Sequence, residues 1–370
     1  MTQNLSISLH REDAYDTIMR HKNSGEKNNM KPIIAITMGD PAGIGPEVIV
    51  KAFATNALYD LCHPVVVGGS KWMTQAASAF APSVSICQRN TLSQCQFLFG
   101  QLEVLEIASE GVPQIVYGAP DETGLVAAMR AIEYAAKLAL SGDIDAIATA
   151  PINKEALKKI GFAHPGHTEF LAHIACTKNF GMMMIGGGLK IMLATIHLAL
   201  RDAILMTKKE LILEKIRLTH QTLKSDFGLP YGKIAVAGLN PHAGEGGLFG
   251  NEEINEIHPA VLSAQAYGIN VSGPYPADTL FFKLKQGQFD AVVALYHDQA
   301  LIPIKLLAFG GGVNVTAGLP FVRTSVDHGT AYDIAGKGIA DCRSLIEAVN
   351  LATEMSSARK QFKKLEATHQ

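Results

Sequence analysis

The sequence predicts an α/β protein with a mostly parallel sheet, and two observations carry that prediction. Short β-branched or aliphatic runs alternate with amphipathic segments from residue 30 onward, which is the pattern of repeated βα units. The runs are apolar almost throughout, as expected of strands that helices cover on both faces. With 370 residues, 48% of them hydrophobic, the chain is long enough to bury one large core or two smaller ones.

The individual elements follow from these patterns in chain order. Six apolar runs are predicted as strands, namely 32–38, 64–69, 145–150, 190–197, 233–239 and 290–297. A helical period predicts helices over 123–142, 208–228 and 340–362. We expect the last helix to pack back on the first of two lobes.

Charge and cysteine usage exclude several classes of protein. Lys and Arg total 32 against 34 Asp and Glu, and no basic block stands out, which argues against a nucleic-acid-binding protein. The five cysteines are scattered and form no CxxC pair, so we expect neither a disulfide framework nor a structural zinc site. Such cysteine usage fits a reducing cytoplasm.

The N-terminal segment and the longest apolar stretch have ordinary interpretations. Residues 1–29 are polar and lack the apolar core of a secretory signal, so we expect a disordered extension, with Met30 as an alternative start. The stretch 182–200 is interrupted by three glycines, Lys190 and His197. We therefore expect a core segment there and no membrane span.

Histidines follow three of the predicted strands. Ligands of parallel α/β sheets bind beyond the carboxyl ends of the strands, and His197, His242 and His297 stand at those positions although the chain has only 13 histidines. Neutral imidazoles that converge on one point suit a transition metal such as zinc or cobalt. A single histidine is more often a core or capping residue, but three at equivalent positions favour a metal site.

A second group of residues is polar and cationic. Lys305 and Arg323 lie in mostly apolar runs, where an unpaired charge is costly. Structural pairing is the alternative for either residue alone. Together with nearby polar residues they predict a cradle for a small phosphate or carboxylate. These neighbours are His167, Thr168, Asn314, Asp327 and His328.

The loop TMGDPAGIGPEV, residues 37–48, resembles a nucleotide-binding loop only in its glycine content. The glycines have the spacing G-x-x-x-G-x-G and no Lys-Ser/Thr pair follows, so neither the dinucleotide nor the Walker pattern is met. We expect a strand-to-helix turn in which Pro46 starts the helix. No cofactor-binding residue is assigned from the sequence.

Taken together, the motifs resemble those of one family, the 4-hydroxythreonine-4-phosphate dehydrogenases. The resemblance runs from about residue 30 to about residue 351. The motifs occur in the family's order: MGDPAGIGPEV, TAPINK, GHTEF, IHLAL, GLNPHAGEGG, PADTLF, YHDQ and VNVTAGLPFVRTSVDHGTA.

The resemblance implies a homodimer of two-lobed α/β subunits, with a cleft between the lobes, similar to isopropylmalate and isocitrate dehydrogenases. The first lobe would comprise 30–160 plus 325–370, and the second, 161–324, would hold the metal and substrate residues. Each active site would draw residues from both subunits. By resemblance, the metal ligands match His197, His242 and His297, and the substrate-binding residues match His167, Thr168, Lys305, Asn314 and Arg323.

The implied activity is an NAD-dependent oxidation and decarboxylation assisted by one divalent metal ion, zinc, cobalt or magnesium, with NADP not excluded as the cofactor. The implied substrate is 4-hydroxy-L-threonine 4-phosphate, on the route to pyridoxal phosphate. Asp278 is a candidate proton acceptor or orienting residue, or else an N-cap of the following helix.

Three alternatives to this substrate or activity stay open. D-threonate or D-erythronate 4-phosphate would yield dihydroxyacetone phosphate by the same chemistry, and a single amine-versus-hydroxyl contact separates these substrates from the first. A phosphate-acetyltransferase-like acyltransferase needs no metal, so the three histidines count against it. A non-catalytic metabolite-binding protein would have little need for all eight polar positions.

Overall fold

The computed structural model describes residues 31–107, 113–164 and 166–368. Residues 32–370 cluster as one compact unit. The expected extension over 1–29 and the alternative start at Met30 lie outside the described residues.

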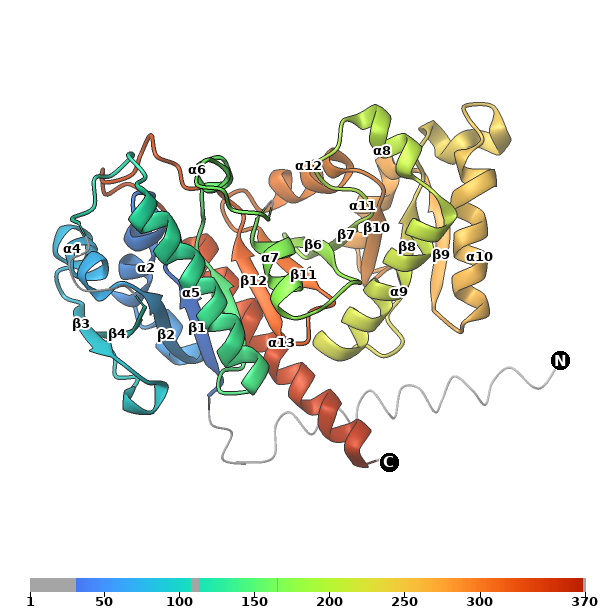
Figure 1. Cartoon of the computed structure of the whole chain (residues 1–370). Helices are drawn as coiled ribbons and strands as arrows, with labels where there is room; N and C mark the ends of the chain where they lie inside the picture. The colour runs from blue at the N-terminus through green and yellow to red at the C-terminus, as the bar shows by residue number, and fades with distance from the viewer. Residues whose placement is uncertain (1–30, 108–112, 165, 369–370) are drawn as a thin grey trace. The chain divides into compact units, whose positions relative to one another are not determined.

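The centre of the fold is a 12-stranded sheet with the order β3-β4-β2-β1-β5-β12-β11-β6-β7-β10-β8-β9 (Figure 1). The strands are β1 (Ile33–Thr37), β2 (His63–Gly68), β3 (Ser85–Arg89), β4 (Gln101–Glu106), β5 (Ala146–Thr149), β6 (Gly181–Gly186), β7 (Leu189–Leu193), β8 (Ile234–Ala237), β9 (Val271–Tyr275), β10 (Ala291–Ala294), β11 (Val313–Ala317) and β12 (Val322–Val326).

Two parallel blocks of strands make up this sheet. The block from β3 to β12 is parallel throughout, and so is the block from β7 to β9. Three antiparallel pairings, β12–β11, β11–β6 and β6–β7, separate the blocks. Because three is an odd number of reversals, the strands of the two blocks run in opposite directions. The sheet is therefore mostly parallel, as the sequence predicts.

Helices and short helical turns connect the strands. They are α2 (Gly45–Phe53), α3 (Ala57–Leu61), α4 (Ser70–Phe80), η1 (Leu92–Gln94), α5 (Glu122–Ser141), α6 (Lys154–Lys159), α7 (His167–Ile174), α8 (Leu200–Met206), α9 (Lys209–Asp226), η2 (Pro241–Gly247), η3 (Glu253–Ile257), α10 (His258–Ala266), α11 (Ala277–Lys285), α12 (His297–Leu307) and α13 (Arg343–Thr368). No helix among the described residues is both long and apolar enough to cross a membrane.

Helices cover both faces of the first block because side chains alternate along a strand. Ile34 and Ile36 of β1 belong to one apolar cluster with residues of α2 and α13. Ala35, which lies between them, belongs to another cluster with residues of α5. This two-sided burial explains why β1 is apolar at nearly every position and shows no alternation in its sequence.

The six predicted strands are all present, and two of them end three or four residues earlier than expected. The strand expected over 190–197 ends at Leu193, and the one expected over 290–297 ends at Ala294. A backbone hydrogen bond just beyond the first of these strands joins Ala194 N to Ala294 O at 2.8 Å. The histidines beyond the two strands therefore lie in the loop after β7 and at the first position of α12.

The sequence did not predict the strands β3, β4, β6, β9, β11 and β12 as such. The apolar stretch 182–200 contains most of the β6–β7 hairpin, and its turn is made by Gly187 and Gly188 with φ of 59° and 82°. These glycines interrupt the apolar stretch because the turn needs the left-handed backbone conformation.

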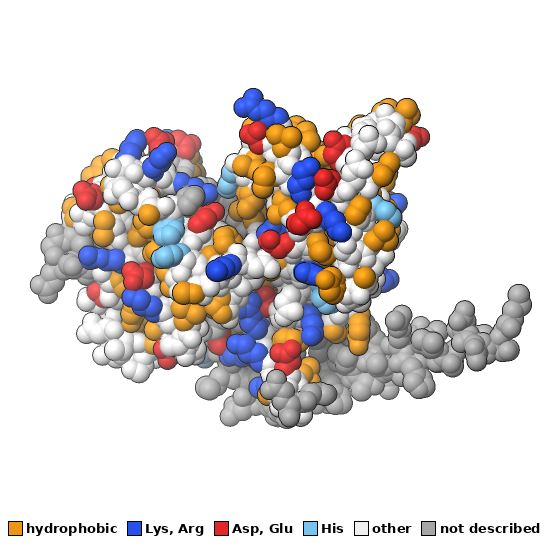
Figure 2. Space-filling model, turned by 45° about the vertical axis from the view of Figure 1, so that its right-hand side comes forward, with side chains coloured by type: hydrophobic (Ala, Val, Ile, Leu, Met, Phe, Trp, Pro, Cys, Tyr) orange, Lys and Arg blue, Asp and Glu red, His pale blue; other side chains and the backbone are white. Residues whose placement is uncertain are grey.

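The C-terminal helix α13 packs on β5 and α2, in the range expected for the first lobe, and also on β12 and α9. The division into two lobes, with 161–324 as the second, stays a prediction. Figure 2 shows Lys and Arg side chains intermixed with Asp and Glu on the face turned to the viewer, in keeping with the net charge of −2.

Candidate functional site

A cavity of about 920 Å³ gathers most of the predicted site residues. Its wall comes from the segment after β5, the start of α7, strands β11 and β12, helix α12 and the loop 327–330. Seven of the nine residues predicted for the site line it, namely His167, Thr168, His197, His297, Lys305, Asn314 and Arg323. The other two, His242 and Asp278, do not.

Arg323 is the most deeply buried cation of this wall, with 2% of its surface exposed. It lies on β12 between β5 and β11, and it donates hydrogen bonds to the hydroxyls of Thr316 at 2.9 Å and Thr149 at 2.7 Å. Burial lowers the pKa of its guanidinium to about 10. Arg323 is still positively charged at neutral pH, and no carboxylate among the described residues forms an ion pair with it.

Four buried polar atoms of the wall lack any hydrogen-bond partner among the described residues. They are His167 Nε2, Asn314 Oδ1, Arg323 Nε and His328 Nε2. An unpartnered buried polar atom costs about 1–3 kcal/mol, and native interiors contain few of them. Their concentration in one wall indicates a place where a polar ligand completes the hydrogen bonding.

His167 and Thr168 begin α7, directly after Gly166. Burial lowers the pKa of His167 well below its ordinary value, and the positive charges of Arg323 and Lys154 add to the effect. The imidazole is therefore neutral at physiological pH and can both donate and accept one hydrogen bond.

Lys305 projects from the last turn of α12 and forms an ion pair with Asp327. The structural pairing considered for Lys305 is thus present, and Asp327 itself belongs to the cavity wall. The lysine side chain remains 41% exposed. It can contact a bound anion while Asp327 holds its ammonium group in position.

Two of the three predicted metal-binding histidines lie together. The ring centroids of His197 and His297 are 5.9 Å apart. Burial lowers the pKa of His197, helped by the charges of Lys154 and His297, which favours the neutral form that binds metals. Nδ1 of His297 lies 2.7 Å from Asp298 Oδ1, which fixes the ring and leaves Nε2 to act as a ligand.

His242 lies apart from this pair within one chain. It follows β8, which is one strand further from β7 than β10 is. It is exposed in η2, where residues 242–246 all have positive φ. Over the described ranges of a single chain, no group of three or more His, Cys, Asp or Glu residues is arranged to hold a metal ion. One chain brings together two of the three predicted ligands.

Asp278 is exposed near the start of α11. The N-cap of α11 is Pro276, and no side chain caps it, so the N-cap alternative for Asp278 is wrong. Asp278 lies inside the first turn, where its carboxylate interacts favourably with the helix dipole. Helix α11 contacts η2, so Asp278 belongs to the same part of the chain as His242.

The glycine-rich loop 37–48 does not line the cavity. It packs against segments that form or adjoin the cavity wall. Gly39 has φ of 74°, and a Cβ there would lie 2.4 Å from the carbonyl oxygen of Pro151. Asp40 donates its N–H to the same oxygen at 3.0 Å, and its carboxylate accepts hydrogen bonds from Ala42 N and the Tyr332 hydroxyl. The loop therefore fixes two segments, 150–154 and 330–332, that line or adjoin the cavity. Pro46 stands in the first turn of α2, as predicted.

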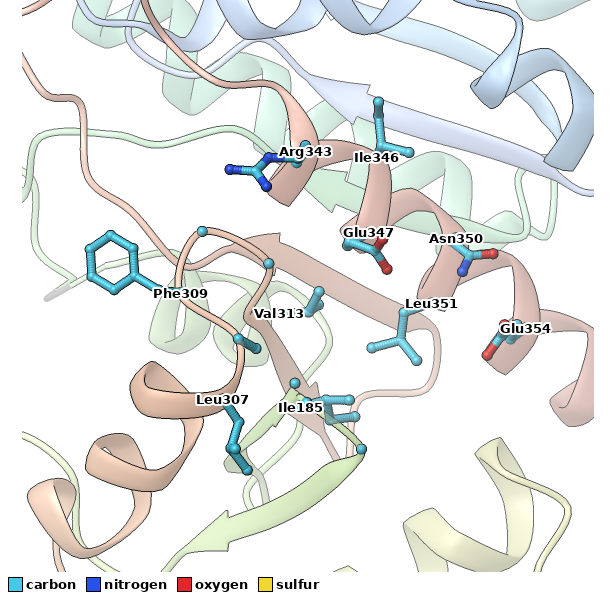
Figure 3. A pocket seen from close by; sticks show the side chains of 16 residues that line it. Ile185, Leu307, Phe309, Val313, Arg343, Ile346, Glu347, Asn350, Leu351 and Glu354 are labelled. Carbon is cyan, nitrogen blue, oxygen red and sulfur yellow. The ribbon is translucent and has the colours of Figure 1, made fainter. Parts of the chain in front are cut away.

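A second cavity of about 530 Å³ lies between the β6–β7 turn, the loop after α12, and α13 (Figure 3). Its lining is partly apolar, with Ile185, Leu307 and Val313, and α13 contributes Glu347 and Glu354. Its cation, Arg343, is ion-paired with Asp341. Its described lining offers no unpaired positive charge to an anionic ligand, so the larger cavity is the better candidate.

Several residues that line the larger cavity or bond to its wall were not among the predicted site residues. Thr149 and Thr316 hold Arg323, Asp327 holds Lys305, and Lys154 stands in the wall. Thr149 lies next to the end of the predicted strand 145–150, and Lys154 follows that strand closely, so their position at a strand end was the signal available in the sequence. The role of Thr316 depends on the pairing of β11 with β12, and Asp327 directly follows β12; neither strand was predicted.

Comparisons with known proteins find relatives along most of the chain. A model of the family described as pyridoxal phosphate biosynthetic protein PdxA matches residues 60–352. A 4-hydroxythreonine-4-phosphate dehydrogenase of Geobacter metallireducens is 47% identical over 331 residues, covering 90% of this chain and 97% of that protein. A D-threonate 4-phosphate dehydrogenase of Cupriavidus necator is 44% identical, covering 89% and 98%. The crystal structure of the Klebsiella pneumoniae 4-hydroxythreonine-4-phosphate dehydrogenase aligns with a TM-score of 0.81 at 42% identity, over 88% and 99% of the two chains.

Proposed function

This chain belongs to the pyridoxal phosphate biosynthetic protein PdxA family, and we propose that it is an NAD-dependent dehydrogenase that oxidises and decarboxylates a four-carbon, 4-phosphorylated hydroxy acid. Relatives named 4-hydroxythreonine-4-phosphate dehydrogenase and relatives named D-threonate 4-phosphate dehydrogenase have similar identity to it. The proposed substrate is 4-hydroxy-L-threonine 4-phosphate. D-threonate or D-erythronate 4-phosphate is the second candidate.

The observation that carries the proposal is the set of unpartnered polar atoms around Arg323. A phosphate has oxygens enough to accept hydrogen bonds from Arg323 Nε and from His167, and a guanidinium suits this anion because its donors diverge in a plane. The amide nitrogen of Asn314 and the ammonium group of Lys305 can donate to further phosphate oxygens. We therefore assign the substrate phosphate to His167, Thr168, Lys305, Asn314 and Arg323.

The donor set of His197 and His297 fits a divalent metal ion that has at least one further ligand. Two imidazoles 5.9 Å apart between ring centroids, one of them oriented by Asp298, are typical of such sites. The metal would supply Lewis acidity toward the oxygen of the substrate carbon that is oxidised, and NAD would accept the hydride. Zinc, cobalt and magnesium remain the candidate ions.

We propose that the third histidine, His242, comes from a second copy of the chain, so that the enzyme is a homodimer with shared sites. Large apolar side chains are exposed on the segments that carry or follow the three histidines, among them Leu198, Leu205, Leu248, Ile302 and Leu306. Leu248 is 73% exposed and Leu306 is 81% exposed. Exposed apolar surface of this kind is expected where another protein chain binds. Asp278 would reach the shared site together with His242.

The substrate assignment is tested by measuring NADH formation from each phosphorylated acid, with added metal and with a chelator control. We expect turnover of at least one of them, lost on chelation. Preference for 4-hydroxy-L-threonine 4-phosphate would support the first candidate, and preference for the D-threonate or D-erythronate compound the second. Absence of turnover with all three would contradict the proposed function.

The shared site is tested by mixing two inactive variants, His197→Ala and His242→Ala. In a mixed dimer, one site would carry both substitutions and the other would carry neither. Random reassortment should therefore restore about a quarter of the wild-type activity. If all three ligands came from one subunit, the mixture would stay as inactive as its components.

A further inference from the structure

We propose that Lys154 is an additional substrate-binding residue whose ammonium group holds the carboxylate of the substrate. This inference rests on the proposed function, because it takes the ligand to be a phosphorylated hydroxy acid. It concerns the anionic group at the other end of that molecule, which the five-residue phosphate cradle leaves without a partner.

Lys154 is the first residue of α6 and lines the cavity. Its side chain passes over Gly166, since a Cβ built at Gly166 would lie 2.9 Å from Lys154 Cε and 3.6 Å from its Nζ. Any larger residue at position 166 would displace the lysine. Lys154 lines the same cavity as His167 and His197, and its charge lowers the pKa of both imidazoles, so the ammonium lies within electrostatic reach of both.

Lys154 differs from the other two cations of the wall in having no partner among the described residues. Lys305 is paired with Asp327, and Arg323 donates to two hydroxyls. For Lys154 no hydrogen bond or ion pair is formed with any residue in the described part of the chain. Glu169 Oε2 lies 3.6 Å from the same Cβ position at Gly166, but no ion pair joins it to the lysine.

Hydrogen bonds of neighbouring residues fix the backbone that carries Lys154. Asn153 caps α6 by accepting a hydrogen bond from Ala156 N at 2.8 Å. Pro151 is bound through its carbonyl oxygen to Asp40 N, and the Asp40 carboxylate is bound in turn to the Tyr332 hydroxyl. An unpaired ammonium on a fixed support, directed along a glycine toward a polar cavity, suits an anionic ligand.

The substrate has two anionic groups, and the wall has cations for both. The phosphate takes the buried guanidinium and its neighbours. The carboxylate remains, and it must lie near the oxidised carbon and hence near the proposed metal ligand His197, because the carboxyl carbon is only two bonds from the carbon that is oxidised. Lys154 offers an unpaired ammonium within electrostatic reach of His197. A product that has lost its carboxylate would lose this contact and keep the contacts to its phosphate.

The test compares ligands with and without a carboxylate, using calorimetric titration in the absence of NAD. The acid that the wild type turns over is one ligand, and dihydroxyacetone phosphate, which lacks a carboxylate, is the other. For Lys154→Gln we expect the Kd of the acid to rise on the order of 10- to 100-fold, as for the loss of one charge-assisted hydrogen bond. The Kd of dihydroxyacetone phosphate should change less than about twofold.

Two further variants serve as controls. Lys158→Gln lies on the same helix, is exposed and does not line the cavity, so it should leave both Kd values unchanged. Lys154→Arg keeps the charge and should recover part of the affinity for the acid. Equal weakening of both ligands in Lys154→Gln, or no weakening of either, would overturn the inference. A wild type that binds and oxidises none of the acids would overturn the proposed function itself.

Discussion

At the scale of single residues, the chain uses buried polar groups in two different ways. Around Arg323, polar atoms are buried without partners among the described residues and lie at the wall of a cavity, as expected of a surface that a ligand completes. Around Asp40, which is 1% exposed, the polar atoms are paired: its carboxylate accepts from Ala42 N and from Tyr332. The first arrangement suits binding, and the second holds the backbone that carries the site.

Asp40 makes a testable contribution to the pH dependence of stability. Burial raises the pKa of its carboxyl above the ordinary 3.8, against the effect of its hydrogen bonds from Tyr332 and Ala42. The folded state therefore holds the proton more tightly than the unfolded state does. The stability that this contributes is present below pH 3.8 and is lost as the pH rises through the folded-state pKa.

We therefore expect Asp40→Asn, which cannot titrate, to gain stability relative to the wild type as the pH rises from about 4 through the raised pKa. Urea unfolding of both proteins over this range measures the difference. A relative stability of the variant that falls with rising pH would contradict a raised pKa for Asp40 in the folded state.

At the scale of elements, one buried ion pair joins the C-terminal helix α13 to α9. Arg359 of α13 donates two hydrogen bonds to Asp226 at the end of α9, at 2.7 and 2.6 Å, and a third to Leu319 O at 3.1 Å. Asp226 is 2% exposed. Removing one partner would leave a buried charge uncompensated, which is much more costly than the loss of an exposed pair.

Arg359→Met should therefore lower the free energy of unfolding by about 3–5 kcal/mol, as measured by urea denaturation. Asp226→Asn combined with it should restore most of the loss, because the uncompensated charge is then absent. Arg343→Ala is a matched control on the same helix: Arg343 is 73% exposed beside Asp341, and its removal should cost less than about 1 kcal/mol. Equal losses for both arginine variants would contradict the distinction.

At the scale of the whole molecule, the described chain is organised around one continuous sheet. The two parallel blocks run in opposite directions and are joined through β11 and β6. The larger cavity takes wall residues from both blocks, since Thr149 ends β5 and His197 lies beyond β7. A ligand that fills it would therefore contact both blocks at once.

We expect a single cooperative unfolding transition in scanning calorimetry, because residues 32–370 form one compact unit. A phosphorylated ligand should raise the temperature of that transition as a whole. Two transitions, with only one of them shifted by the ligand, would instead indicate that the two predicted lobes unfold independently.

The sequence by itself determined the α/β class, six strands of the sheet and the candidates for the phosphate cradle. Apolar runs and strand ends are local features, and the cradle residues stand in motifs long enough to identify. It also determined the family, which the comparisons confirm.

Only the tertiary structure decided which of those residues meet. Strands β11 and β12 bring Thr316 and Arg323 together, and the sheet order places β10, not β8, next to β7, so His197 meets His297 while His242 stays apart. Neither relation follows from spacing along the chain, because strand order and pairing are set by packing between distant segments.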